Sequence, residues 1–210
     1  MRRCVSRRAL LAASAALVLT RGARAADPVD DVLSRIARAR AAIRTIQGPF
    51  VQTRTIGLLS TDVRSTGTLT LLRPDRLRWE LGPPDDVTFW IGPEGLAYRG
   101  AHGQARVASG TARIAGALDD LRALLGGDPS SLRLRWALRV LRDDSTGVEL
   151  DAMPAGTAPL RGLRFSLLPD LVRPARALLV EGPRDRTVIE FGSLVVDAPV
   201  DAERMRPPRG

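Results

Sequence analysis

Residues 66–91 read TGTLTLLRPDRLRWELGPPDDVTFWI, and apolar and polar side chains alternate along them in three runs. The apolar positions of these runs are Leu69 and Leu71, then Leu77, Trp79 and Leu81, then Val87, Phe89 and Ile91. Alternation with a period of two predicts β-strands that have one apolar face. Because proline cannot donate a ladder hydrogen bond, Pro74 and the Pro83-Pro84 pair predict the turns between them. We therefore expect three antiparallel strands whose apolar faces lie together.

Arg73 has the same parity as Leu69 and Leu71. If its strand runs straight to the end, the guanidinium lies at the rim of the apolar face, where a charge needs a partner or water. If the strand has already twisted outward, Arg73 is solvated. The spacing alone leaves both possibilities open.

This part of the chain resembles the periplasmic outer-membrane lipoprotein carrier family, the LolA-like proteins. The residues that match the family pattern in order are Gly67, Leu69, Leu71, Arg73, Pro74, Arg78, Trp79, Glu80, Gly95 and Tyr98. The resemblance extends over most of residues 30–208. It includes a Phe-x-Gln sequence at Phe50 and a Thr-x-Ile-x-Phe sequence at Thr187. Leu77 and Met205 are departures, because the family more often has an aromatic residue at these positions.

Residues 1–25 are expected to be a secretory signal peptide. They contain an arginine-rich start, an apolar run over residues 9–19 and an Ala-Arg-Ala sequence at residues 23–25. The apolar run is too short to span a bilayer, and the last three residues are typical of a cleavage site. Arg7-Arg8 resembles a twin-arginine signal, so export by the Sec or the Tat route stays open. We expect one domain over residues 26–210, located in the periplasm.

The charge and cysteine content exclude several classes of protein. The whole chain has a formal net charge of +9, but the leader holds six of its arginines and none of its acids. The remaining net charge of about +3 is too small to indicate nucleic-acid binding. Cys4 is the only cysteine and precedes the apolar run of the leader, so it is not placed as a lipid-anchor cysteine. We expect no disulfide and no thiol chemistry in the exported protein.

Helical spacing of apolar residues predicts two amphipathic helices. The first is expected over about residues 28–46, ended by Gly48-Pro49. Its apolar face is Val29, Val32, Leu33, Ile36, Ile43 and Ile46, and its arginines Arg35, Arg38, Arg40 and Arg44 lie mostly on the other side. The second ends at Gly126-Gly127 and has the apolar face Ile114, Ala117, Leu118, Leu121, Leu124 and Leu125. We interpret the first helix as a cover for the sheet rather than as a membrane-binding helix.

Further alternating segments predict more strands, at residues 50–55, 96–99, 104–108, 132–140, 147–152, 161–168, 175–181 and 186–196. Strands and helices do not alternate along the chain, which argues against a doubly wound parallel sheet. The pattern favours an α+β fold with about ten antiparallel strands and two main helices.

The sequence contains no convincing catalytic or metal-binding motif. His102 is the only histidine and falls in a predicted turn, and no Gly-x-Ser-x-Gly or phosphate-binding glycine pattern is present. The acidic pairs at residues 85–86, 119–120 and 143–144 adjoin turn residues or lie on the polar side of the second helix, which is typical of solvated carboxylates. We therefore expect no enzyme activity, no cofactor and no metal.

The family resemblance implies a strongly curved, incomplete antiparallel β-barrel of about 10–11 strands, covered by helices. In such a protein the acyl chains of a lipoprotein occupy the space between sheet and helices. An inner-membrane ABC-type complex releases the cargo to the carrier, and an outer-membrane receptor accepts it. We expect a monomer that does not insert stably into a membrane.

The residues expected to line the lipid cavity are Phe50, Leu69, Leu71, Leu77, Trp79, Leu81, Val87, Phe89 and Ile91. Arg73 is expected to hold the lid shut by donating to carbonyl groups, with the end of the second helix near Gly126-Gly127 as the natural acceptor. The expected lid carries Leu118, Leu121 and Leu125.

Two other functions fit the same sequence. One is a carrier for a different lipid or a glycolipid. The other is a binding or sensing module with this fold that does not travel between membranes.

Overall fold

The computed structural model describes residues 27–58, 61–93, 95–100, 103–106, 120, 122–125, 129–156 and 160–207. The expected leader, His102 and most of the expected second helix lie outside these residues. Among the predicted lid residues, Leu118 and Leu121 are outside the described part and Leu125 is inside it.

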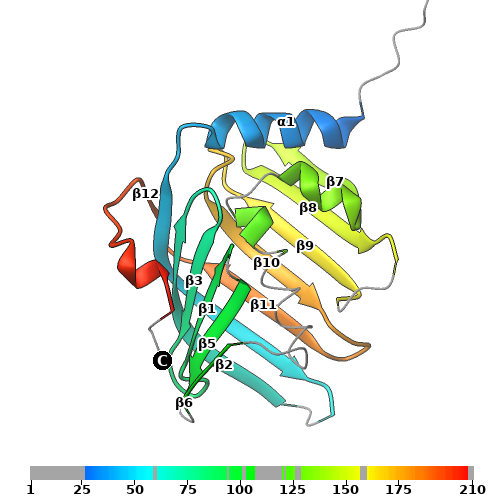
Figure 1. The fold of residues 1–210 in the computed structure, drawn as a ribbon. Helices are drawn as coiled ribbons and strands as arrows, with labels where there is room; N and C mark the ends of the chain where they lie inside the picture. The colour runs from blue at the N-terminus through cyan, green and yellow to red at the C-terminus, as the bar shows by residue number, and fades with distance from the viewer. Residues whose placement is uncertain are drawn as a thin grey trace, which may run out of the picture.

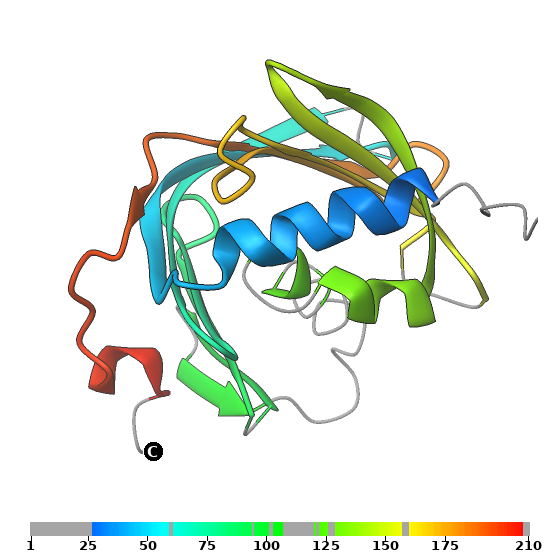
Figure 2. The same ribbon diagram turned by 90° about the horizontal axis from the view of Figure 1, so that it is seen from above.

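In the described chain, twelve strands form one antiparallel sheet with the order β6-β5-β4-β3-β2-β1-β11-β10-β9-β8-β7, and β12 pairs with β1. The strands are β1 (Thr45–Ile56), β2 (Thr61–Leu72), β3 (Arg76–Leu81), β4 (Val87–Gly92), β5 (Gly95–Gly100), β6 (Gly103–Arg106), β7 (Trp136–Asp144), β8 (Gly147–Pro154), β9 (Gly162–Leu167), β10 (Pro174–Val180), β11 (Arg186–Phe191) and β12 (Val195–Val196). The sheet curves strongly without closing (Figures 1 and 2). The predicted α+β fold with an open antiparallel barrel is confirmed.

The two halves of the chain meet in the middle of this sheet. Strand β1 pairs with β2 on one side and with β11 on the other, in a register that runs from Phe50↔Phe191 to Thr55↔Arg186. All other neighbours in the main order follow one another along the chain. The edges of the curved sheet are therefore β6 and β7, and its centre is formed by residues far apart in sequence.

Helix α1 (Pro28–Arg40) begins at a well-formed N-cap. The Asp27 side chain accepts a hydrogen bond of 3.0 Å from the Val29 N–H, and Pro28 occupies the first turn, where its missing donor costs nothing. The apolar stripe predicted for this helix is buried at Val29, Val32, Leu33 and Ile36. The helix crosses one end of the curved sheet, and the short helical pieces of residues 122–125 and η2 (Pro129–Leu134) lie beside it (Figure 2).

The first helix is shorter than its periodicity predicts. It ends at Arg40, and Thr45 to Gly48 already belong to β1. Ile46 keeps the helical spacing but pairs with Leu71 of β2 and Val196 of β12. Because backbone groups here find strand partners on both sides, tertiary pairing overrides the local pattern. Gly48-Pro49 is therefore part of a strand and not a helix stop.

Two other boundaries differ from the predicted ones. The strand expected at residues 132–140 begins only at Trp136, since η2 occupies Pro129–Leu134. Leu132 is buried and Leu134 is 86% exposed, so their alternation does not mark one face of a strand. The strand expected at residues 186–196 is divided into β11 and β12.

The core lies between the inner face of the sheet and the helical pieces. Leu69, Leu71 and Leu77 of the sheet share one buried apolar cluster with Ile36 of α1 and with Leu125. None of the described helices is both long and apolar enough to cross a membrane.

Candidate functional site

The nine residues predicted to line a cavity share the inner face of the sheet. The register sets Leu69 beside Trp79 and Trp79 beside Phe89, and it sets Leu71 beside Leu77 and Leu77 beside Ile91. Paired residues on neighbouring antiparallel strands point to the same side. Phe50, Leu81 and Val87 form a further row, in which Gly67 separates Phe50 from Leu81. We call these nine residues the apolar face.

Burial is uneven along the apolar face. Leu69, Leu71 and Leu77 are 0% exposed, and Phe50 and Trp79 are 2% exposed. Val87 and Phe89 are only partly buried. The apolar face is thus tightly covered toward α1 and less covered where β4 begins.

An aromatic cluster occupies the middle of the apolar face. The rings of Phe50 and Trp79 stack with centroids 3.9 Å apart, and Phe191 meets Trp79 edge-on at 6.3 Å. Gly67 makes this stack possible, because a Cβ there would lie 2.3 Å from both the Phe50 ring and the Glu80 carbonyl oxygen. Phe191, from the far end of the chain, was not among the predicted site residues.

A cluster of polar side chains adjoins the apolar face, on the same side of β1 and β2. Arg54 and Ser65 follow the parity of Phe50 and Gly67, and both contact Asp85 in the turn before β4. The Arg54 Nη2 to Asp85 Oδ1 distance is 3.0 Å, and the Asp85 side chain is only 15% exposed. The prediction that this acidic pair is simply solvated is wrong for Asp85, because the turn folds its carboxylate against Arg54.

Arg73 lies at the rim of the apolar face, as the straight-strand possibility requires. Its Nη1 donates to the Arg40 carbonyl oxygen and, at 3.4 Å, to the Ile43 carbonyl oxygen. These acceptors belong to the end of α1 and the turn after it. The acceptors expected from the sequence are at the end of the second helix, near Gly126-Gly127, which lies outside the described residues. Within the described chain, Arg73 ties β2 to α1.

The Arg40 side chain connects α1 to the helical piece of residues 122–125. Its Nη1 donates to the Leu124 carbonyl oxygen, and its Nη2 donates at 3.3 Å to the Val172 carbonyl oxygen in the loop after β9. The side chain is 1% exposed, so the placement of Arg40 on the polar side of the helix is wrong. A signal was present, because Arg40 continues the stripe of Leu33 and Ile36 at helical spacing. Burial, and secondarily the nearby charge of Arg73, lowers the pKa of Arg40 to about 10.

The covering side also contributes apolar groups. Ala123, Leu124, Leu125 and Leu132 belong to the same buried cluster as the apolar face, and Leu125 is 1% exposed. Leu125 therefore lies where a lid residue is expected.

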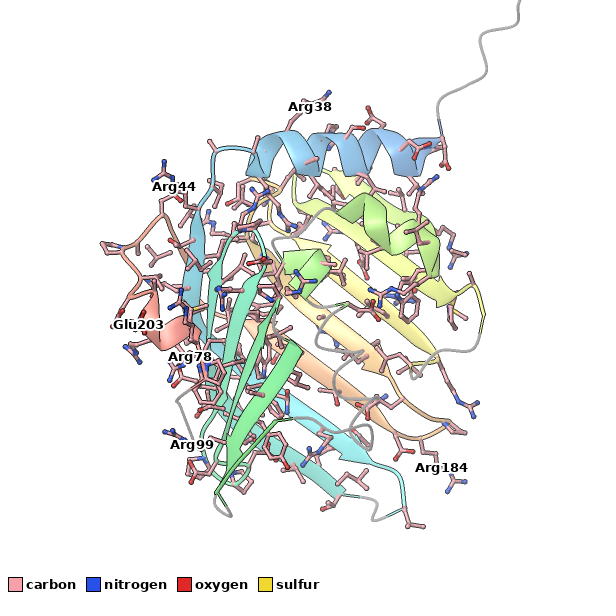
Figure 3. All side chains as sticks on the ribbon, in the orientation of Figure 1. Arg38, Arg44, Arg78, Arg99, Arg184 and Glu203 are labelled. Carbon is pink, nitrogen blue, oxygen red and sulfur yellow. The ribbon has the colours of Figure 1, made fainter. Side chains whose placement is uncertain are left out.

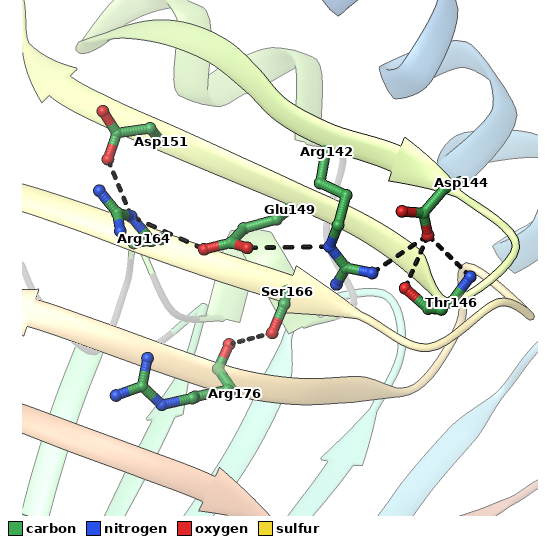
Figure 4. A network of polar contacts seen from close by, with 8 residues as sticks. All are labelled: Arg142, Asp144, Thr146, Glu149, Asp151, Arg164, Ser166 and Arg176. Carbon is green, nitrogen blue, oxygen red and sulfur yellow. Dashed lines mark hydrogen bonds and ion pairs between the residues drawn. The ribbon is translucent and has the colours of Figure 1, made fainter.

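The outer face of the sheet is polar and carries ion-pair networks. On β7, β8 and β9, Arg164 bridges Glu149 and Asp151, while Glu149 and Asp144 contact Arg142 (Figure 4). Such exposed pairs contribute little to stability individually. Asp144 is thus paired as well as solvated, in line with a surface role.

Trp90 is the large aromatic residue of the outer face. Its Nε1 donates at 3.0 Å to the Arg204 carbonyl oxygen beside η3 (Glu203–Met205), and its ring lies 5.8 Å from the Arg78 guanidinium and 5.9 Å from that of Arg99. Figure 3 shows Arg78 and Glu203 on this flank of the molecule. Trp90 therefore attaches the C-terminal segment around Arg204 to the outer face of the sheet.

Nothing in the described residues indicates a metal centre, since no group of three or more His, Cys, Asp or Glu side chains is close enough to hold an ion. The arrangement that the structure does offer is a covered apolar face, closed on one side by backbone carbonyls that accept from two arginines.

Residues 41–89 match the family model of the outer membrane lipoprotein carrier protein LolA. These residues include eight of the nine positions of the apolar face and Arg73. A comparison with curated proteins finds no match.

Solved structures share the fold at low sequence identity. A DUF1329 family protein from Desulfovibrio piger has a TM-score of 0.51 and 10% identity, covering 86% of this chain and 98% of that one. The MucA/MucB complex of Pseudomonas aeruginosa contains a chain with a TM-score of 0.50 and 18% identity, covering 87% of this chain and 62% of that one. A LolA superfamily protein from Nitrosomonas europaea has a TM-score of 0.46 and 9% identity, covering 85% of this chain and 97% of that one.

Proposed function

We propose that this chain, which belongs to a LolA-like family, carries the acyl chains of a lipoprotein from the inner to the outer membrane by binding them on its apolar face. The observation that supports this most is the register itself. It brings nine apolar side chains from four strands onto one inner face, and the family match spans that region.

The physical need for such a face is large. Each buried methylene is worth about 0.8 kcal/mol, so a pair of long acyl chains exposed to water costs on the order of tens of kcal/mol. A carrier must cover these chains in transit and still release them. A face that the protein covers with its own helices meets the second requirement, because cargo must displace protein contacts to bind.

Closure by hydrogen bonds is the second part of the proposal. Arg73 holds α1 against β2, and Arg40 holds α1 against the 122–125 piece. Entry of acyl chains breaks some of these bonds, and their re-formation favours release. Leu118, Leu121 and Leu125 would move with the lid.

The setting of this activity follows from the family and the leader. We propose a periplasmic protein that is exported with cleavage of residues 1–25, that receives cargo from an inner-membrane ABC-type complex and that delivers it to an outer-membrane receptor. We propose that it acts as a monomer and as a binding protein rather than as an enzyme.

A pair of variants on β4 tests the acyl-binding face. Phe89 is on the apolar face and only partly buried, so Phe89→Asn should leave the fold intact while it weakens binding of a fluorescent acyl probe by about ten-fold, equivalent to about 1.4 kcal/mol. Thr88→Asn, one residue earlier and on the opposite face, is the matched control and should bind as wild type. Equal affinities in both variants, with unchanged circular dichroism, would contradict the proposed location.

A further inference from the structure

Arg40 is a buried cation that makes no ion pair with a carboxylate of the described residues. It is 1% exposed, and its partners in the described chain are the carbonyl oxygens of Leu124 and Val172. Its Nε is buried and makes no hydrogen bond. Asp170 acts on it only at a distance, because that carboxylate accepts from the Val172 and Arg173 N–H groups and pairs with the Arg173 guanidinium.

Apart from the Asp170 carboxylate, which is already paired with Arg173, the described surroundings of this cation are apolar or positively charged. Leu124 and Val172, which supply its acceptors, belong to the buried cluster that contains Leu69 and Leu71 of the apolar face. A second positive charge, the Arg73 guanidinium, lowers the pKa of Arg40 further and donates to the Arg40 carbonyl oxygen. Two guanidinium groups at the rim of an apolar face form a site that favours an anion.

Opening of the protein would take a hydrogen-bond acceptor away from Arg40. Leu69, Leu71 and Leu77 are 0% exposed, so acyl chains reach them only if a covering element moves. Movement of the 122–125 piece removes the Leu124 carbonyl from Arg40 and leaves a charged donor among apolar groups. A ligand that brings only methylenes cannot replace that acceptor. A ligand whose chain ends in charged oxygens can.

We infer that Arg40, assisted by Arg73, is an anion-binding site at the rim of the apolar face, and that the protein takes acyl lipids that end in a carboxylate or a phosphate. This inference rests on the proposed binding of acyl chains, and it extends the cargo beyond neutral lipoprotein acyl groups. A guanidinium binds two oxygens of one carboxylate or phosphate side by side, whereas an ester offers only a weaker neutral acceptor.

Competition for a bound neutral fluorescent acyl probe tests the inference on the delipidated exported protein at pH 8. Oleate and methyl oleate share one acyl chain and differ in having a charged carboxylate or a neutral methyl ester, and dioleoylphosphatidylglycerol and dioleoylglycerol provide the phosphate arm. We expect oleate to bind about ten-fold more tightly than methyl oleate, with the phospholipid arm showing whether phosphate is also accepted. Arg40→Met should remove the preference for oleate over methyl oleate, and Arg40→Lys should retain most of it.

Arg38→Met is the matched control, because Arg38 lies two residues earlier on α1 and is exposed (Figure 3). It should keep the wild-type preference. If Arg40→Met does not fold, the ratio of oleate affinity to methyl oleate affinity in wild type and in Arg40→Lys still tests the inference. A second measurement is the titration of bound oleate labelled at its carboxyl carbon. The bound carboxylate should stay ionised to a lower pH than that of free oleate. Equal binding of oleate and methyl oleate by wild type overturns the inference and leaves the carrier function intact. Failure of all four lipids to bind contradicts the carrier function itself.

Discussion

Arg73 and Arg40 make consecutive hydrogen bonds at the end of α1. Arg73 donates to the Arg40 carbonyl oxygen, and the Arg40 guanidinium donates onward to Leu124 and Val172. One path of hydrogen bonds thereby joins β2, α1, the 122–125 piece and the loop after β9. Each acceptor is a backbone carbonyl, so the closure depends on the positions of elements rather than on partner side chains.

The removal of Arg73 should change cargo release more than folding. Arg73→Leu deletes hydrogen bonds to a charged donor that exist in the closed protein, each worth about 1.5–3 kcal/mol. Loss of even one such bond, about 1.5 kcal/mol, should slow transfer about ten-fold or more, because the weakened closed state competes less with the open, loaded state. The measurement is the rate at which a fluorescent acyl probe moves from the protein to acceptor membranes.

Arg44→Leu is the control for this change, since Arg44 follows the Ile43 whose carbonyl oxygen Arg73 contacts, and its side chain is exposed (Figure 3). It should transfer at the wild-type rate. Wild-type transfer by Arg73→Leu, with an unchanged melting temperature, would mean that Arg73 is only a surface bend residue.

At the scale of the element, β2 depends on one glycine for its fit to β1 and β3. A Cβ at Gly67 would lie 2.3 Å from the Phe50 ring and from the Glu80 carbonyl oxygen, so Gly67→Ala must push the Phe50–Trp79 stack or the β3 backbone aside. Overpacking of this kind costs about 1–3 kcal/mol, and urea denaturation should show the loss.

Gly82, just after β3, offers the comparison. The nearest atom to a Cβ there is 3.5 Å away, so Gly82→Ala should change the free energy of unfolding by less than about 0.5 kcal/mol. A loss of the same size in both variants would show that the effect comes from glycine in general rather than from the contact at residue 67.

A salt bridge fixes the middle of α1 to β7. Arg35 Nη1 and Nη2 donate to Asp143 at 2.7 and 2.9 Å. The Arg35 hydrogen bond lowers the pKa of Asp143 below its usual value. A carboxyl group with a lowered folded-state pKa adds stability above its unfolded pKa of about 3.9, and this contribution is lost as the pH falls through the lower folded-state value.

A double-mutant cycle with Arg35→Met and Asp143→Asn measures this bridge. Solvent screening limits the coupling to no more than about 1 kcal/mol at pH 7, and it should decline toward zero as the pH falls below about 3.9. Urea denaturation at several pH values provides the four free energies of unfolding. A coupling that does not change with pH would contradict the assignment of the effect to the Asp143 charge.

At the scale of the whole molecule, β1 makes the two halves of the sheet one unit. It pairs with β2 along its full length and with β11 over six positions. Phe50 and Trp79 from the first half meet Phe191 from the second, so unfolding of either half exposes the aromatic cluster of the other. The molecule should therefore unfold in one cooperative step.

Trp136→Phe makes this testable. Trp136 is the tryptophan of the second half, so the fluorescence of the variant comes from Trp79 and Trp90 alone, whereas far-ultraviolet circular dichroism reports the whole sheet. The two urea transitions should have the same midpoint and slope. Separate midpoints would show that the halves unfold independently.

The sequence by itself determined the strands of the central region and the residues that share their apolar side. Alternation at Leu69, Trp79 and Phe89 is a local property, and the prolines at residues 74 and 83–84 set the turns, so the register follows from the chain alone. The amphipathic start of α1 was equally readable, because a cap at Asp27 and an apolar stripe are local as well.

Only the tertiary structure decided where α1 ends, what Arg73 contacts and that Arg40 is buried. Ile46 fits a helix or a strand, and pairing with β2 and β12 selects the strand. The acceptors of Arg40 come from residues 124 and 172, and the ring that completes the aromatic cluster comes from Phe191. Contacts between residues so distant in sequence carry no periodicity, because their energy depends on packing across elements rather than on the conformation of any one of them.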